Sequence, residues 1–237
     1  MIKKLIRKLV LREKADQKSF ASYLKKRGVE IGENVRFFSP SKTLVDLTYP
    51  WLLSIGSNVV VAHGVVILTH DGAWLSLKRT PEFKGAICGG QAPVRIGNNV
   101  FLGVNAIVTK GVTIGDNVII GVGSVVTKDC ESNSVYAGVP AKRIMSIEEY
   151  YQKRREAQFS EAKQLVLRYY DVFAIKPPKE MLMEYFMLFC NVDEALENPV
   201  FAKKMNECLN IEDSIKFMKN NPPMFESYDD FLAACFK

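Results

Sequence analysis

The chain has two histidines, His63 and His70, and five widely spaced cysteines, so few side chains are available for acid–base, nucleophilic or metal chemistry. His70 lies in the segment ILTHDG, directly before Asp71, and a second acidic residue, Asp46, lies in the segment LVDLTY. A neutral imidazole can take a proton from a hydroxyl group, and a carboxylate can hold the imidazole in the tautomer that this requires. Asp46 and Asp71 are both candidates for that carboxylate, but Asp46 could instead bind the acceptor molecule that carries the hydroxyl group, and Asp71 could simply initiate a turn before Gly72. His63 falls at a turn position of a short repeat, where we expect a surface or groove-rim residue.

The same residue types exclude several classes of site. A metal centre of three histidines cannot be built within a chain that has two, and the cysteines form no CxxC pair, so no metal site is predicted. The sequence contains no GxxxxGK[ST] loop for a nucleoside triphosphate. The odd number of scattered cysteines favours a reducing, cytoplasmic environment. No apolar run approaches the roughly 20 residues that cross a bilayer.

The net charge of +6 is concentrated at the N-terminus. Residues 1–30 hold ten Lys or Arg and three Asp or Glu, so the rest of the chain sums to −1. The basic character therefore gives no indication of nucleic-acid binding. Within residues 1–11, aliphatic and basic side chains occupy opposite faces of a helix, which predicts a basic amphipathic helix. This helix either associates peripherally with an anionic membrane or caps the open end of the adjacent domain, and the sequence leaves both open.

The elements that must position His70 follow a six-residue repeat. Every sixth residue from 96 to 126 is aliphatic, and the residue after it is glycine or threonine. The aliphatic positions are Ile96, Leu102, Val108, Ile114, Ile120 and Val126. A period of six matches neither an α-helix nor alternating strands, but it suits a parallel β-solenoid whose short strands turn a corner at each repeat. We expect the aliphatic side chains to stack inside this solenoid.

The repeat is interrupted once, over residues 71–93, and resumes at Val94. An insertion that keeps the register on both sides must leave the solenoid at a corner. Its length, its two adjacent glycines and its aromatic residues predict a lid or a wall of a substrate site next to His70.

The pattern becomes helical after residue 145. Residues 162–173 carry apolar side chains at i, i+3, i+4 and i+7 spacing, and the prolines at 177 and 178 should end that helix. Residues 181–190 are apolar on nearly all sides and are predicted to be buried. Ser227, followed by Asp230, predicts the N-terminal cap of a last helix.

These patterns divide the chain into three parts. We expect an N-terminal basic helical segment over residues 1–27, a β-solenoid domain over residues 28–145 that includes the loop 71–93, and a helical extension over residues 146–237. The sequence does not indicate what the extension does.

The solenoid resembles a known family. The segment that begins IGNNVFLGVNAIV and ends AGVPAKRI is similar to the hexapeptide-repeat acyltransferases, in particular the branch of galactoside, maltose and polysaccharide O-acetyltransferases. The resemblance covers about residues 28–147. It implies a left-handed parallel β-helix, a homotrimer, and acetyl-coenzyme A (acetyl-CoA) bound between adjacent subunits. It also implies a catalytic histidine directly ahead of the inserted loop, where His70 stands.

The resemblance further implies which residues meet the coenzyme. Small residues on successive coils would let the pantetheine arm lie close to the solenoid, and cations further on would pair with the phosphates. The implied contacts are Gly103, Val104, Gly121, Val122, Thr127, Lys128, Lys142 and Arg143.

The function expected from these observations is acetyl transfer from acetyl-CoA to a sugar hydroxyl of a polysaccharide or glycan precursor, with His70 as general base. Another small acceptor, such as an amino sugar or serine, is an alternative, and so is a non-catalytic trimeric scaffold. His70, together with Lys128 and Lys142, favours an enzyme. The asparagine with which galactoside-type enzymes contact the acceptor has no match that we can identify here, so the acceptor stays open.

Overall fold

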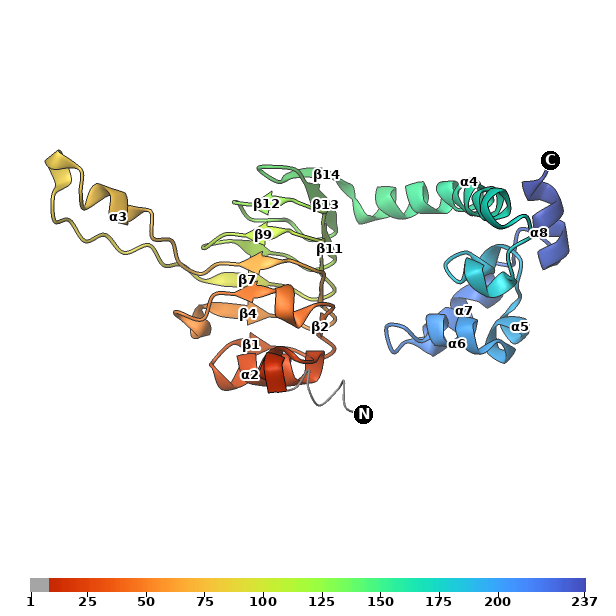
Figure 1. Cartoon of the computed structure of the whole chain (residues 1–237), viewed down its shortest axis with the longest axis horizontal. Coiled ribbons are helices and arrows are strands. Elements are labelled where there is room, and N and C mark those ends of the chain that lie inside the picture. Colours follow the sequence, from red (N-terminus) through yellow and green to blue (C-terminus); the bar gives the residue numbers. More distant parts are fainter. Residues whose placement is uncertain (1–8) are drawn as a thin grey trace. The chain divides into compact units, whose positions relative to one another are not determined.

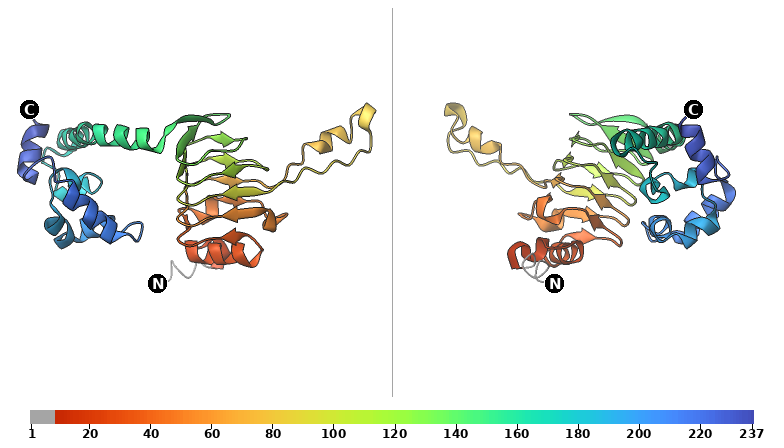
Figure 2. Two further views of the ribbon diagram at one scale, coloured as in Figure 1. Left: turned by 180° about the vertical axis from the view of Figure 1, so that it is seen from behind. Right: turned by 45° about the vertical axis from the view of Figure 1, so that its right-hand side comes forward.

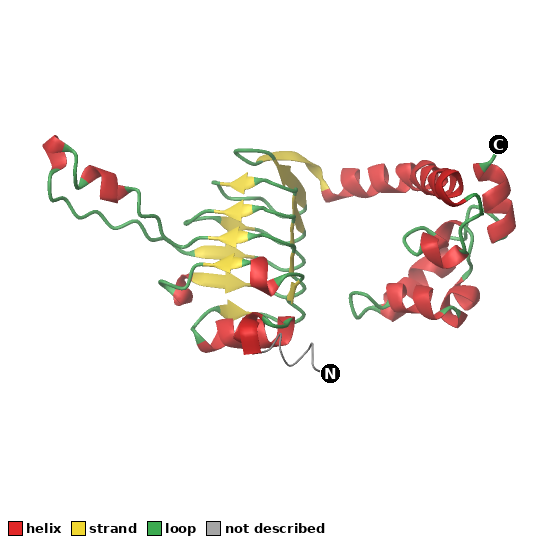
Figure 3. Cartoon of the chain, in the orientation of Figure 1, coloured by secondary structure: helices red, strands yellow, loops and turns green. Residues whose placement is uncertain are grey.

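The structure, a computed structural model, describes residues 9–237 and forms two compact units, Met1–Tyr150 and Tyr151–Lys237. The amphipathic helix expected over residues 1–11 lies mostly outside the described residues. Within the described chain, every strand belongs to the first unit (Figure 3).

The first unit is a parallel β-solenoid whose coils each contribute one short strand to three sheets, here called A, B and C (Figure 1). Sheet A contains β1 (Glu30–Ile31), β4 (Leu53–Ile55), β7 (Val94–Ile96) and β10 (Thr113–Ile114). Sheet B contains β2 (Arg36–Phe37), β5 (Val60–Val61), β8 (Phe101–Leu102), β11 (Val118–Ile120), β13 (Ser134–Ala137) and β14 (Lys142–Ser146). Sheet C contains β3 (Leu44–Val45), β6 (Val66–Ile67), β9 (Ile107–Val108) and β12 (Val125–Val126). The predicted parallel solenoid is confirmed; β14 alone among these strands pairs antiparallel, with β13.

The six-residue repeat stacks the same side chain of each coil above its counterpart. In sheet A, Ile55 pairs with Ile96 and Ile96 with Ile114, and all three are buried. Burial of one such side chain is worth about 1.5–3 kcal/mol, so the interior column is the main stabilising feature of the unit. At the corner between sheets A and B, Asn99 and Asn117 adopt positive φ and are hydrogen-bonded side chain to side chain at 2.9 Å. Asparagine tolerates this conformation better than a branched residue does.

A short helix covers the N-terminal end of the solenoid. After η1 (Arg12–Lys14), α2 (Gln17–Lys26) begins at Asp16, whose side chain accepts a hydrogen bond from the backbone N–H of Ser19. Phe20 and Leu24 are fully buried and join the solenoid core, with the ring of Phe20 5.0 Å from that of Phe37. A terminal coil would otherwise expose its apolar interior, so α2 acts as the cap.

The inserted arm, residues 71–93, leaves the solenoid at the corner between sheets C and A (Figure 2). It contains α3 (Trp74–Leu77) and η4 (Pro81–Phe83), and most of its side chains are exposed. At the base of the inserted arm, the outgoing and returning segments pair antiparallel through His70 and Gln91. Two other turns carry short helices, η2 (Pro40–Lys42) and η3 (Pro50–Leu52).

The second unit is helical and has its own core. It contains most of α4 (Ile147–Phe173), then η5 (Lys179–Leu182), η6 (Phe186–Leu188), α5 (Val192–Glu197), α6 (Pro199–Met205), α7 (Ile211–Asn220) and α8 (Tyr228–Cys235). Val166, Phe201 and Phe231 are among its fully buried residues. Ser227 caps α8 by accepting a hydrogen bond from the backbone N–H of Asp230, as predicted.

One prediction for this unit is wrong in part. Residues 181–190 fold into the two short helices η5 and η6 instead of one buried segment, and Met181 and Met183 are 51% and 46% exposed. Leu182 and Phe186, by contrast, are buried. A run in which Glu184 is the only charged residue has too little periodicity to separate its inner face from its outer face.

Candidate active site

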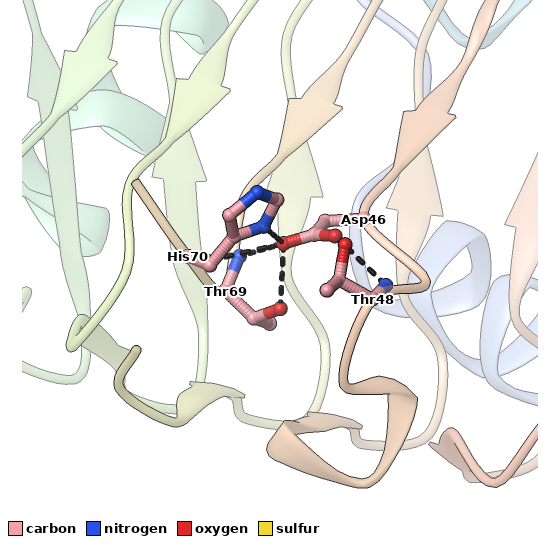
Figure 4. Close-up of polar contacts among 4 residues, drawn as sticks. All are labelled: Asp46, Thr48, Thr69 and His70. Carbon is pink, nitrogen blue, oxygen red and sulfur yellow. Dashed lines mark hydrogen bonds and ion pairs between the residues drawn. The ribbon is translucent and has the colours of Figure 1, made fainter. Parts of the chain in front are cut away.

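Sheet C brings Asp46 and His70 together across one coil. β3 pairs with β6 so that Val45 lies beside Ile67, and the chain leaves both strands at the corner between sheets C and A. Asp46 directly follows Val45, and His70 lies three residues after Ile67, so the side chain of Asp46 reaches into the turn of the next coil, 24 positions later in sequence. His70 Nδ1 lies 2.5 Å from Asp46 Oδ2 (Figure 4).

Asp46 is a buried carboxylate with several donors. Its Oδ2 accepts from the backbone N–H and the hydroxyl of Thr69, at 3.0 and 2.8 Å, and from the backbone N–H of His70 at 3.0 Å. Its Oδ1 accepts from the backbone N–H of Thr48 at 3.0 Å. Burial alone would raise the pKa of Asp46, but the hydrogen bonds from Thr48, His70 and Thr69 outweigh it and hold that pKa well below its ordinary range. Asp46 is therefore ionised at neutral pH.

The ionised carboxylate determines the tautomer of His70. A carboxylate can only accept hydrogen bonds, so the proton of a neutral His70 must lie on Nδ1, and Nε2 carries the lone pair. The His70 side chain is 39% exposed, so a substrate can reach it. This is the arrangement of a general base that a second group orients.

Asp71 interacts with other groups. Its Oδ2 lies 3.1 Å from Lys110 Nζ, and its Oδ1 accepts from the backbone N–H of Ala73 at 2.7 Å. These contacts, the one with Ala73 first, lower the pKa of this exposed carboxyl group. The backbone N–H of Asp71 also donates to the carbonyl of Gly90 at 2.8 Å. Asp71 and Lys110 thus fasten the base of the inserted arm to the next coil, while the carboxylate that contacts the imidazole is Asp46.

The glycines expected near the coenzyme are also required by the close packing of adjacent coils. A Cβ atom on Gly103 would lie 2.7 Å from the carbonyl oxygen of Ile120, and one on Gly121 would lie 2.9 Å from the Cβ of Ala137. Their backbone N–H groups donate along the solenoid, to Ile120 and Tyr136. Close stacking of the coils explains these glycines without a ligand, which the sequence interpretation had not recognised.

The other expected coenzyme residues are exposed on the last coils. Val104 and Val122 follow the two glycines and are 40% and 75% exposed. Thr127 and Lys128 follow β12, two coils beyond the strand that leads to His70, and both are exposed. The exposed residues Lys142 and Arg143 lie on β14.

His63 lies at a different corner, between sheets B and C. Its Nδ1 is 3.1 Å from the hydroxyl of Ser39, and the side chain is exposed. The structure therefore places the two histidines at different corners of the solenoid, and each has one partner at Nδ1.

Sequence reasoning missed three residues that support the site, namely Thr48, Thr69 and Lys110. Thr48 acts through its backbone N–H, for which the sequence carries no signal. Lys110 could have been found by aligning the turn after Val108 with the turn after Ile67, because these two residues pair in sheet C.

Residues 9–237 contain neither a membrane-spanning helix nor a metal-binding cluster of side chains. No helix in this range is long and apolar enough to span a membrane. No group of three or more His, Cys, Asp or Glu side chains is arranged to hold a metal ion there.

Comparison with known proteins agrees with the six-residue repeat and with the fold. The family described as "Hexapeptide repeat of succinyl-transferase" matches residues 93–128. Protein CapG of Staphylococcus aureus is 42% identical over 153 residues, which is 64% of this chain and 83% of that protein. Galactoside O-acetyltransferase of Escherichia coli (strain K12) is 36% identical over 137 residues, 56% of this chain and 63% of that protein. A crystal structure of a maltose O-acetyltransferase from Clostridium difficile 630 is 29% identical with a TM-score of 0.39, over 54% of this chain and 75% of that one.

The relatives whose names state an activity are acetyltransferases, which makes this chain an acyl-transferring enzyme built on a β-solenoid. The chain belongs to the hexapeptide-repeat acetyltransferase family, because it spans most of a relative at 42% identity and contains the matching repeat.

Proposed function

We propose that this acetyltransferase moves the acetyl group of acetyl-CoA to a hydroxyl group of a sugar in a polysaccharide or glycan precursor. The observation that carries the proposal is the hydrogen bond between His70 Nδ1 and Asp46 Oδ2, because it makes Nε2 the basic atom. The E. coli relative is named for a galactoside, which supports a sugar as acceptor. The left-handed winding implied by the family resemblance is part of the same proposal.

His70 carries one proton from the acceptor hydroxyl to the sulfur of the coenzyme. Its Nε2 takes the proton of the acceptor hydroxyl as the hydroxyl oxygen bonds to the acetyl carbonyl carbon. When the carbon–sulfur bond of the thioester breaks, His70 returns that proton to the departing sulfur. Asp46 stabilises the imidazolium between the two transfers and keeps Nδ1 protonated throughout. Asp71 has no part in this proton transfer and holds the arm in place through Lys110.

The surface beyond His70 suits the coenzyme, which supplies an activated thioester when bound. Val104 and Val122 offer exposed apolar surface on successive coils, beside Gly103 and Gly121, for the pantetheine arm. Thr127, Lys128, Lys142 and Arg143 are assigned to the phosphates.

A charge reversal tests the phosphate assignment. Lys142→Glu should weaken acetyl-CoA binding more than Lys142→Ala does. Added salt should reduce the difference in affinity between the two variants, because salt screens the proposed charge pair with phosphate. Reversal of the exposed Lys42, which lies in η2 between sheets B and C, is the control. Equal affinities of the two Lys142 variants by calorimetry would remove this residue from the coenzyme site.

The outer faces of the sheets support a trimer. Neighbouring outward side chains of sheet A are Glu30, Ser54, Arg95 and Thr113, all polar. Those of sheet C are Leu44, Val66, Ile107 and Val125, all aliphatic. A continuous aliphatic column on the outside of a solenoid is suited to burial against a second copy. Ile107→Glu should abolish the oligomer in sedimentation, whereas Thr113→Glu should leave it intact; an unchanged oligomer in the Ile107 variant would count against this interface.

Peripheral membrane association through residues 1–11 remains a separate proposal that rests on the sequence pattern. It is tested by co-sedimentation of the full chain with anionic liposomes, compared with a chain that lacks residues 2–11. Sedimentation with neutral liposomes to the same extent would contradict it.

The acceptor is tested by an assay of coenzyme A release with the full chain. Acetyl-CoA is held constant and the acceptor is varied over monosaccharides, oligosaccharides, amino sugars and serine. Release that depends on a sugar, with an acetyl ester recovered in the product, is the expected result. If coenzyme A were released only with serine, or only with acetylation of the amino group of an amino sugar, that group and not a sugar hydroxyl would be the acceptor.

A further inference from the structure

The turn that contains Asp46 also carries an exposed aromatic side chain. Residues 46–52 connect β3 to β4 at the same corner as His70, one coil below it. Trp51, one of two tryptophans in the chain, is 67% exposed in this turn. The indole therefore lies on the same edge of the solenoid as the catalytic imidazole.

This indole belongs to a firmly held turn. Pro50 opens the short helix η3 and is buried, and the chain enters sheet A directly afterwards at the buried Leu53. The backbone N–H of Leu52 donates to the carbonyl of Tyr49 at 3.0 Å. The ring of Tyr49 meets the ring of Trp51 edge to face, with centroids 5.8 Å apart and planes at 75°. Proline, backbone hydrogen bond and aromatic contact together limit the conformations of Trp51, so binding costs little ordering entropy.

The aromatic pair is connected to the catalytic pair through one carboxylate. Asp46 Oδ2 contacts His70, and Asp46 Oδ1 accepts the backbone N–H of Thr48, the residue before Tyr49. The position of the turn and the orientation of the imidazole are therefore set by the same buried group. Adjacent coils are about 4.8 Å apart, so a chain-like ligand that follows this edge can reach both.

The chemistry of the turn selects the ligand. A sugar ring has one face of C–H groups, which stacks on an indole, and a rim of hydroxyl groups, which stays hydrated or meets polar side chains. Trp51 offers the aromatic face, and the same turn and the strand after it also carry the exposed Thr48 and the half-buried Ser54. A peptide helix or an acyl chain would need a wider apolar surface than one indole with polar neighbours provides.

We propose that Trp51, braced by Tyr49, is a subsite for a second sugar residue of an oligosaccharide acceptor, next to the residue whose hydroxyl His70 deprotonates. This inference rests on the proposed sugar acetylation and adds that the preferred acceptor is a glycan chain instead of a monosaccharide.

Acceptor length provides the test. With malto-, chito- and galacto-tetraoses and their monosaccharides as acceptors, Trp51→Ala should raise KM for the active tetrasaccharide about tenfold, as expected for one lost stacking contact. It should leave KM for acetyl-CoA and the rate with the monosaccharide unchanged. Trp51→Phe should retain most of the affinity for the tetrasaccharide. In a Trp74→Phe background, where Trp51 is the single tryptophan and is excited selectively, the active tetrasaccharide should shift the tryptophan fluorescence.

The possible results separate this inference from the function on which it rests. Equal effects of Trp51→Ala on both acceptor lengths, a raised KM for acetyl-CoA, or dissociation of the oligomer in sedimentation would overturn the subsite while sugar acetylation stands. Absence of transfer to every sugar by the unaltered protein would overturn the proposed function and the subsite together.

Discussion

The two histidines of this chain occupy comparable positions but have different partners. Each lies at a turn that follows a short strand, and each presents Nδ1 to a residue from the coil below. At the corner between sheets C and A, the partner of His70 is the buried, ionised carboxylate of Asp46. At the corner between sheets B and C, the partner of His63 is the hydroxyl of Ser39.

The difference decides which histidine can serve as a base. A hydroxyl group donates or accepts, so Ser39 is compatible with either tautomer of His63. An ionised carboxylate only accepts, so Asp46 fixes the proton of His70 on Nδ1 and directs basicity to Nε2. Asp46 also offsets the positive charge that His70 gains on taking a proton, and Ser39 has no charge with which to do so. The solenoid thus repeats its geometry at both corners but orients the imidazole with a carboxylate at only one of them.

Removal of each imidazole is the strongest test of this contrast. His70→Ala should lower kcat by roughly 10²-fold or more, because a general base is lost. His63→Ala is the matched control and should leave kcat near that of the unaltered protein. Both are measured by coenzyme A release, with coenzyme affinity checked by calorimetry. Near-normal turnover of His70→Ala would shift the role of base to His63 or Asp46.

Removal of each partner should have the next largest effect. Asp46→Asn keeps the shape of the side chain but loses the charge that fixes the tautomer, so kcat should fall by about ten- to a hundredfold. Ser39→Ala should change it little. The pH–rate profile distinguishes positioning from folding, since loss of the carboxylate should move the acidic limb, on which the base becomes protonated, to lower pH, whereas a folding defect would only lower the amplitude. An unmoved profile in Asp46→Asn would argue that the carboxylate does not act on the imidazole.

The contrast between the two corners was only partly predictable from the sequence. The repeat predicted the stacked interior because its period is fixed by the coil. It did not decide between Asp46 and Asp71, because adjacency in sequence favours Asp71 whereas contact across coils favours Asp46. The register of β3 and β6, continued by one residue, places Asp46 opposite Leu68 and not opposite His70, so neither the repeat nor the strand register reveals that Asp46 and His70 meet. The repeat alone cannot show how close the next coil lies, so it does not reveal that the glycines at 103 and 121 are also required by the stacking of the coils.

The stability of the protein in acid should report the same carboxylate. The folded-state pKa of Asp46 lies below its ordinary value of 3.8, so the unfolded chain binds the proton more readily. The stability contributed by Asp46 is therefore present above about pH 4 and is lost as pH falls through the folded-state pKa. Urea denaturation at pH 7 and pH 3 should show a smaller loss of unfolding free energy for Asp46→Asn than for the unaltered protein. Ser39→Ala should lose as much unfolding free energy between pH 7 and pH 3 as the unaltered protein does. An equally large loss in Asp46→Asn would contradict the lowered pKa of Asp46.

The smallest expected effect comes from a pair of buried threonines, one at each corner. Thr69 is fully buried and its hydroxyl donates to Asp46 Oδ2 at 2.8 Å, while Thr43, also buried, donates to the carbonyl of Ser39 at 3.0 Å. Replacement of either by valine removes one hydrogen bond and should cost about 1 kcal/mol of stability. Only Thr69→Val withdraws a donor from the carboxylate that orients the imidazole. Its kcat should therefore fall a few-fold while that of Thr43→Val stays unchanged, and equal kcat values at equal stability would show that the remaining donors hold Asp46 well enough without the hydroxyl.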